Sequence, residues 1–428
     1  MVCIGVGATV LYLQNYGYLP SPFFHFKSET FMDWYNPAYW AHHAGIYSVA
    51  RSVYPPLSFD FLRLFSAPSC YTRSGIIGRG CDILGFVTIT IFLFINLILA
   101  MLIFWREGQY TALPRALAIS LGSSMLYGWE RGNLVLPCFT AFMLAYGAMV
   151  RSASLRALLA AVAVNFKPYL LILPVTQALR RDWPGVIRFS VACLGVYLVS
   201  FVILRAGSPF ELARDAFEFL VAHGDNRYGI FQFTTTYDSL LALLGASVPL
   251  RLFLGETIVG LARVVLPTVM ALGAAGATLC LLGAVVRPGA VDERRLAAIG
   301  LSLMFVFGSP GAYALVFLLF LVFLEPWRGA GRIIALIGAY LWCVPWDFNL
   351  APVLHETTFS FLSGRPVRVE LFLTLGELIR PGLVLMIQFG LVAASIPDLR
   401  RALRRQPAPT GVAAATACPS SLSAPDFP

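Results

Sequence analysis

Long apolar runs recur along this chain and predict membrane-spanning helices. The clearest run, Ile83–Phe104, carries no charged residue. A helix of about 20 apolar residues crosses the hydrocarbon core of a bilayer, which is about 30 Å thick. Several of the other runs are too short for a full crossing, which in a polytopic bundle indicates helices that are tilted, broken or covered by protein. These runs lie close to Val2–Tyr18, Ala112–Tyr127, Leu134–Val150, Val186–Leu204, Val265–Val286, Leu296–Phe307, Ala312–Leu324, Ile333–Trp346 and Leu378–Ile396.

Arginine clusters at alternate connections assign the two sides of the membrane. Because cytoplasmic loops carry the excess of Lys and Arg, we place these connections in the cytoplasm. Segments 20–82, 205–251 and 347–377 then form three long outer loops, and both termini are cytoplasmic. Residues 1–396 are predicted to form one transmembrane domain. The remaining residues, 397–428, form a cytoplasmic tail; it is rich in Pro, Ala, Ser and Thr from Gln406 on, which predicts disorder.

One apolar stretch, Leu155–Leu179, carries Lys167-Pro168 at its middle and arginines at both ends. A proline cannot continue the hydrogen-bond ladder of a helix. Two half-length helices that enter and return to the cytoplasm satisfy the positive-inside rule better than one crossing. Counting them as two gives about 12 segments. We therefore expect an all-α polytopic membrane protein, whose long outer loops carry short amphipathic helices.

Composition agrees with a membrane protein and excludes two other classes. Hydrophobic residues make up 58% of the chain and charged residues 12%, against about 45–50% and about 25% in soluble domains. A soluble enzyme is therefore excluded, and so is a disordered protein, which combines low hydrophobicity with high net charge. The net charge of +9 follows from the basic loops and does not indicate a nucleic-acid partner.

The cysteines and histidines predict no metal site and no cofactor. The eight cysteines lack the spacing of metal ligands. Adjacent His42 and His43 face different ways on a helix. Cys70 and Cys81 both fall in the first outer loop, on the side where a bacterial periplasm permits oxidation. We hypothesise a disulfide between them; the alternative is two free thiols.

The first outer loop contains the candidate acids. Glu29 and Asp33 lie four residues apart, so a helix places both carboxylates on one face. Asp33 stands among apolar residues near the membrane surface, which suits a general base; the alternative is a solvated surface charge. The aromatic residues that follow, Tyr47 among them, bind a sugar or lipid on one interpretation and form an interfacial belt on the other.

Three later positions are also candidates. Glu130 and Arg131 occupy a very short outer turn, where Arg131 can pair with a carboxylate or phosphate; a plain charged turn is the alternative. Lys167 lies in an apolar segment beside a helix break, which marks a functional site unless it snorkels to the interface. The turn that ends at Tyr313 is punctuated by Pro310 and Gly311 and is by itself a simple helical hairpin turn.

Together these pieces resemble the GT-C glycosyltransferases, specifically glycosyltransferase family eighty-seven, the polyprenol-phosphate-mannose-dependent α-mannosyltransferases. The resemblance covers most of the chain and rests on the order of five features. These are Asp33, the segment "GIYSVARSVYPPL" at 45–57, "ERGN" at 130–133, "KPY" at 167–169 and "SPGAY" at 309–313. Family members often carry a histidine in the last of these turns, and this chain has none there.

The resemblance implies a GT-C-like bundle and a reaction at the outer face of the cell inner membrane. A sugar, most readily mannose, would move from a polyprenyl phosphate to a glycolipid or polysaccharide acceptor with inversion. Asp33 would be the general base. Glu29, Tyr47 and Tyr313 join the set of substrate-binding candidates, Tyr54 would shape the outer platform, and Lys167 would lie near the lipid phosphate. Glu130, Arg131 and Asn133 would line the cavity.

Two rival functions remain open from the sequence. One is a transporter or flippase for a lipid-linked saccharide, which would favour charges along the bundle centre and internal repeats. The other is a non-catalytic membrane subunit of a polysaccharide export machine.

Overall fold

The computed structural model describes residues 2–20, 23, 30–225, 254–307, 311–359 and 365–404 and is mostly helical. Four of its helices are long and apolar enough to cross a membrane: α5 (Ile83–Arg106), α11 (Trp183–Leu204), α15 (Glu256–Val286) and α19 (Leu375–Arg404). Shorter apolar helices are α8 (Val135–Tyr146), α9 (Ala153–Phe166), α10 (Ile172–Leu179), α17 (Leu315–Phe323) and α18 (Ala330–Trp342). The described residues therefore do not form the expected bundle of about 12 segments.

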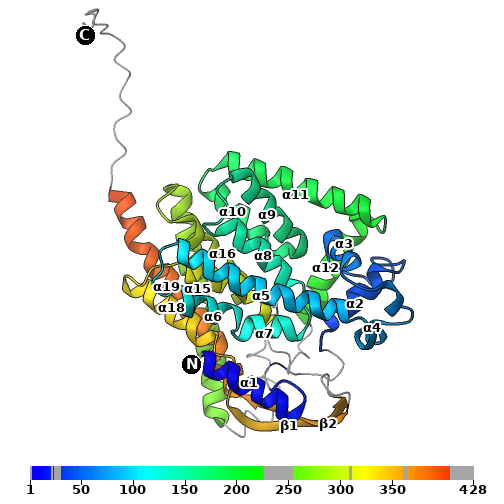
Figure 1. Cartoon of the computed structure of the whole chain (residues 1–428). Helices are drawn as coiled ribbons and strands as arrows, with labels where there is room; N and C mark the ends of the chain where they lie inside the picture. The colour runs from blue at the N-terminus through cyan, green and yellow to red at the C-terminus, as the bar shows by residue number, and fades with distance from the viewer. Residues whose placement is uncertain are drawn as a thin grey trace, which may run out of the picture.

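The long helices expose apolar side chains, which is what a bilayer stabilises. Only 11% of the most apolar window of α11 is buried. Its exposed side chains include Ile187, Val191 and Leu198. Because soluble proteins rarely expose apolar patches of this extent, these helices identify a membrane protein. In Figure 1, α9 packs between α8 and α11, and α8 packs in turn against α5.

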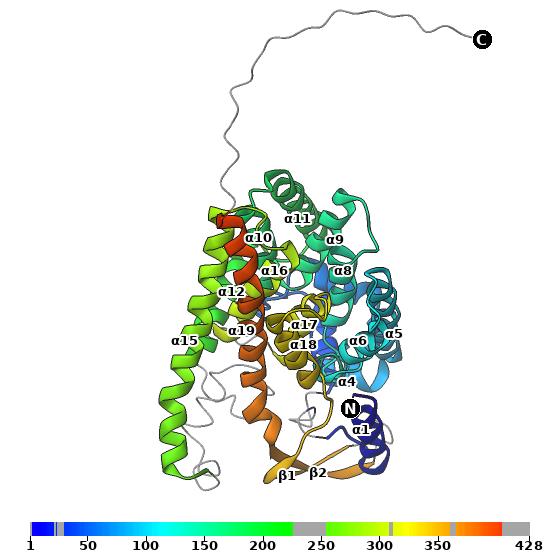
Figure 2. The same cartoon turned by 90° about the vertical axis from the view of Figure 1, so that its left-hand side faces the viewer.

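The helices α15, α18 and α19 form a second group. Figure 2 shows α15 and α19 as two long helices side by side. Glycines bring α18 and α19 together: a Cβ atom added to Gly390 would lie 2.7 Å from the Gly331 carbonyl oxygen. Small residues permit such close backbone approach between membrane helices. Between this group and the first lies α17, all of whose residues are buried, so it is a short apolar helix covered by protein.

The predicted break at Lys167 is present. Helix α9 ends at Phe166, and Pro168 opens the 3₁₀ helix η2 (Pro168–Leu171), which leads into α10. The sides of the membrane on which α9 begins and α10 ends stay a prediction. The short remaining helices of the bundle are α1 (Val2–Tyr16), α6 (Ala112–Ser120), α7 (Ser123–Glu130), α16 (Glu293–Phe307) and η3 (Ala312–Ala314).

The predicted outer loops differ from one another in structure. The first contains short helices, as expected: α2 (Met32–Ala41), α3 (Pro56–Leu64), η1 (Pro68–Cys70) and α4 (Gly75–Cys81). The second contains α12 (Pro209–Asp225). The third corrects the all-α expectation, because β1 (Asn349–Phe359) and β2 (Pro366–Thr374) pair antiparallel in it, with His355 opposite Glu370. This hairpin lies beside α1 (Figure 2). The hydroxyl of Tyr18, two residues after the end of α1, accepts a hydrogen bond from the Glu370 N–H at 3.2 Å.

The tail boundary at 397 falls inside a helix, because α19 continues to Arg404. Asp398 is a reason for this continuation. Its carboxylate pairs with Arg295 at 2.7 Å, and Arg295 also binds Glu325 at 2.6 Å. Arg332 reaches the same Glu325 at 2.9 Å. The last turns of α19 are thus tied to α16 and α18, while residues 405–428 lie outside the described part.

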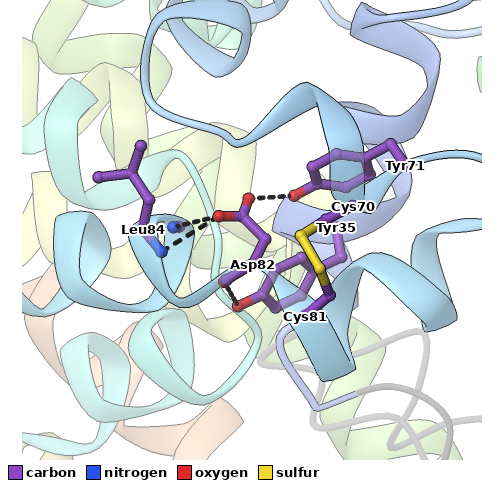
Figure 3. The surroundings of a disulfide bond; sticks show 7 residues. Tyr35, Cys70, Tyr71, Cys81, Asp82 and Leu84 are labelled. Carbon is purple, nitrogen blue, oxygen red and sulfur yellow. Dashed lines mark hydrogen bonds between the residues drawn. A yellow bond between two sulfur atoms is a disulfide. The ribbon is translucent and has the colours of Figure 1, made fainter.

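The hypothesised disulfide is present: Cys70 and Cys81 are bonded, with 5.5 Å between their Cα atoms. Figure 3 shows its surroundings. Asp82, next to Cys81, accepts hydrogen bonds from the Leu84 and Gly85 N–H groups and so caps α5. It also accepts one from the Tyr71 hydroxyl at 2.6 Å, while its carbonyl accepts one from Tyr35 of α2 at 2.9 Å. The bridge therefore fixes the start of α5 against α2.

Candidate functional site

The site begins where α2 meets the turn after α7. Two backbone hydrogen bonds join them: the Phe31 N–H donates to the Glu130 carbonyl at 2.8 Å, and the Asp33 N–H donates to the Arg131 carbonyl at 3.0 Å. Residues almost 100 positions apart in sequence are thereby held side by side. Asp33, in the first turn of α2, consequently lies over the "ERGN" turn.

Gly132 allows this close approach. Its φ of +64° is one that residues with a Cβ rarely adopt. A Cβ atom there would also lie 3.0 Å from the Phe31 carbonyl oxygen and 3.1 Å from the Trp34 Cβ. The glycine in "ERGN" is thus required by the turn and by the contact with α2.

The Asp33 carboxylate is held by both of its oxygens. Arg131 Nη2 donates to Oδ1 at 3.0 Å, and Asn133 Nδ2 donates to Oδ2 at 2.7 Å. The Asn133 side-chain oxygen accepts a hydrogen bond at 2.9 Å from the N–H of Val135, the first residue of α8, and this contact orients its amide. A carboxylate oxygen can accept two hydrogen bonds. Since 19% of the Asp33 side chain remains exposed, it keeps capacity for a further hydroxyl donor.

Lys167, whose charge interacts with that of Asp33, is 6% exposed. Its ammonium stands over the Tyr54 ring at 4.8 Å and the Tyr313 ring at 5.5 Å. Aromatic faces attract a cation in this way. Among the described residues no carboxylate lies within ion-pair distance of Lys167, and the one whose charge acts on it is Asp33. Glu130, the other acidic residue near the site, is not an ion-pair partner of Lys167.

Tyrosines form the walls around Lys167. The Tyr47 hydroxyl donates to the Tyr54 carbonyl at 3.1 Å. Tyr54 directly precedes Pro55, the N-cap residue of α3. Burial raises the pKa of Tyr54 well above its usual value, so its hydroxyl stays a donor at neutral pH. Tyr313, in η3, stacks on Tyr127 with 5.7 Å between ring centroids.

Most of the predicted site residues therefore come together in what we name the Asp33–Lys167 cluster. Tyr47 lies behind Tyr54 and supports it instead of facing the cluster. Glu29 lies outside the described residues. The cluster consists of Asp33, Tyr54, Glu130, Arg131, Asn133, Lys167 and Tyr313.

Three neighbours were missed from the sequence. Arg79 of α4 donates to the Thr30 carbonyl at 3.1 Å, and its charge interacts with Glu130. Its position inside the disulfide-closed loop was the available signal. Tyr169 was visible as the third residue of "KPY". Tyr127 stands three residues before Glu130, nearly one helical turn away, which could have suggested a shared face.

The histidine pair does not assemble a metal site. His42 Nε2 lies 2.8 Å from the Ser66 hydroxyl, while His43 Nδ1 lies 2.7 Å from the Tyr39 carbonyl. In the part of the chain that the structure describes, no three His, Cys, Asp or Glu side chains gather as metal ligands would.

Comparison with known proteins assigns no relative. No family model matches the chain, and no match was found among curated proteins or solved structures.

Proposed function

We propose that this chain is a membrane glycosyltransferase that moves a hexose from a polyprenyl phosphate to a lipid-linked or polysaccharide acceptor. We take the hexose to be mannose. The observation that carries the proposal is the Asp33–Lys167 cluster: a carboxylate held in place with spare acceptor capacity, near a buried lysine that pairs with no carboxylate among the described residues. The resemblance to the GT-C family supplies the substrate class. The reaction takes place at the outer face of the membrane.

The reaction is a single displacement. Asp33 accepts the proton of the acceptor hydroxyl, whose oxygen bonds to C1 of the sugar. The bond from C1 to the phosphate oxygen breaks, and its electron pair leaves with the lipid phosphate. Lys167 stabilises the charge that develops on this leaving group, as fixed cationic donors do in other active sites. Attack opposite the leaving group inverts the configuration at C1.

The charges around the cluster suit an anionic donor. Among the described residues, Asp33 and Glu130 are acidic, whereas Arg79, Arg131 and Lys167 are basic. A sugar linked through phosphate to a lipid brings an anion to these basic groups. The proposal therefore takes a polyprenyl-phosphate sugar as donor.

The experiment is sugar transfer by the purified protein in liposomes that contain a panel of labelled polyprenyl-phosphate sugars. We expect label to leave the polyprenyl phosphate for an added glycolipid acceptor. Lys167→Met should raise the donor KM by roughly 10-fold or more, because a charge-assisted contact is lost. Arg328→Met, which removes an exposed positive charge elsewhere, serves as the matched control. Movement of intact lipid-linked sugar across the bilayer without transfer would instead identify a flippase.

A further inference from the structure

Tyr169 carries a polar group that no contact in the described structure accounts for. It is the second residue of η2, the 3₁₀ helix that begins directly after Lys167. Its hydroxyl oxygen is buried and has no hydrogen-bond partner among the described residues. Buried hydroxyls are nearly always hydrogen-bonded, so an unmet one in a native fold calls for a reason.

The surroundings place this hydroxyl at the Asp33–Lys167 cluster. Its electrostatic neighbours are the hydroxyls of Tyr54 and Tyr313 and the thiol of Cys138. The first two are the tyrosines whose rings flank the Lys167 ammonium. The Cys138 thiol is already engaged with the Ala163 carbonyl at 3.3 Å. The Tyr169 ring itself is fixed by an edge-on contact with Phe317, with 6.1 Å between centroids.

None of the described groups accepts a hydrogen bond from the Tyr169 hydroxyl, the Tyr54 and Tyr313 hydroxyls included. Lys167 has donors and no acceptor. The Asp33 carboxylate is held by Arg131 and Asn133 and accepts no hydrogen bond from the Tyr169 hydroxyl. A tyrosine hydroxyl next to the two tyrosines that flank an ammonium therefore matches a ligand with several acceptor oxygens and a negative charge. A phosphate group has both properties.

We propose that the Tyr169 hydroxyl donates a hydrogen bond to the phosphate oxygen that Lys167 neutralises, so that both residues hold the phosphate of the donor. This inference rests on the proposed function, since it assigns the residue that completes the phosphate subsite. Tyr169 binds the group and takes no part in proton transfer. Without ligand the hydroxyl has no hydrogen-bond acceptor among the described residues, because the acceptor is the phosphate of the donor.

The test uses Tyr169→Phe, which removes only the hydroxyl oxygen and keeps the contact with Phe317. Tyr146→Phe is the matched control: Tyr146, at the end of α8, packs on Phe142 with 4.8 Å between ring centroids and is not part of the cluster. Thermal unfolding of the purified protein in detergent is measured with and without farnesyl phosphate as the probe, and the donor KM is measured in liposomes.

We expect opposite effects on the free and the bound protein. Without probe, Tyr169→Phe should unfold at the wild-type temperature or above it, because an unmet buried hydroxyl has been removed. Its affinity for farnesyl phosphate should fall by roughly 10–100-fold, and the donor KM should rise by a similar factor with a smaller change in kcat. Tyr146→Phe should match the wild type in binding.

Wild-type affinity of Tyr169→Phe, or a lower unfolding temperature without probe, would overturn the inference and leave the proposed function standing. A wild-type protein that neither binds farnesyl phosphate nor transfers sugar would overturn both together.

Discussion

At the scale of single residues, Asn133 decides how Asp33 is presented. The oxygen of its amide accepts a hydrogen bond from the N–H of Val135 at the start of α8, and the nitrogen donates to Asp33 Oδ2. Because the side chain is fully buried, its orientation is set by two partners at once. Preorganised contacts of this kind hold a reacting group in place without a cost at the moment of reaction. The position of Asp33 therefore depends on the start of α8 as much as on α2.

Asp60 of α3 shows a different residue-scale effect. Both of its carboxylate oxygens are buried without a hydrogen-bond partner among the described residues. Burial raises the pKa of this carboxyl from 3.8 to about 6, although nearby Arg63 opposes the shift. A carboxyl with a raised pKa in the folded state favours folding when it is protonated. Its contribution to stability is therefore present below about pH 4 and is lost as the pH rises to about 6.

We accordingly expect Asp60→Asn to unfold at a higher temperature than the wild type at pH 8, with the difference closing at pH 4. Thermal unfolding across this pH range in detergent measures it. The control is Glu218→Gln. Glu218 lies exposed on α12 and pairs with Arg51, so this variant should unfold close to the wild-type temperature at either pH. An unfolding temperature of Asp60→Asn at or below wild type at pH 8 would contradict the assigned cause.

At the scale of elements, the disulfide connects the helix that carries Asp33 to the rest of the molecule. Cys70 and Cys81 close a loop whose end, Asp82, both caps α5 and accepts from Tyr35 two residues after Asp33. The same loop carries Arg79 to the Thr30 carbonyl, next to the backbone pairing of Phe31 with Glu130. The bridge thus stabilises the elements that hold the site.

The double variant Cys70→Ser/Cys81→Ser should be less stable by about 2–3 kcal/mol, because the bridge restricts the unfolded chain over a separation of 11 residues. Reducing agent should lower the unfolding temperature of the wild type toward that of the variant and leave the variant unchanged. Equal unfolding temperatures of the oxidised wild type and the variant would contradict this prediction, because the disulfide would then contribute nothing to stability.

At the scale of the whole molecule, apolar runs predicted a helical membrane protein but overstated its number of full spans. Length alone cannot tell a crossing helix from one such as α17, whose surroundings are entirely protein. The break at Lys167-Pro168 was predictable because proline has a local, context-free effect on a helix. The hairpin over 349–374 was missed although Val367, Arg368, Val369 and Glu370 alternate in the manner of a strand.

The site was predictable in its residue types and less so in its pairings. The order of Asp33, "ERGN", "KPY" and Tyr313 named the residues that meet. Their geometry follows from contacts between segments far apart in the chain, such as α2 against the turn at 131–133. No periodicity in the sequence reports such contacts. For the same reason, the sequence did not predict that Arg79 lies near Glu130 or that the Tyr47 hydroxyl donates to the Tyr54 carbonyl.

The most direct test of the central claim is the transfer rate of Asp33→Asn relative to wild type in liposomes with polyprenyl-phosphate mannose and acceptor. The amide keeps the shape of the side chain and removes its basicity. Equal expression and an unfolding temperature near that of the wild type establish that the variant folds. We predict a fall in kcat of about 10²–10⁴-fold, the usual effect of losing a general base. Transfer by folded Asp33→Asn at close to the wild-type rate would contradict the account.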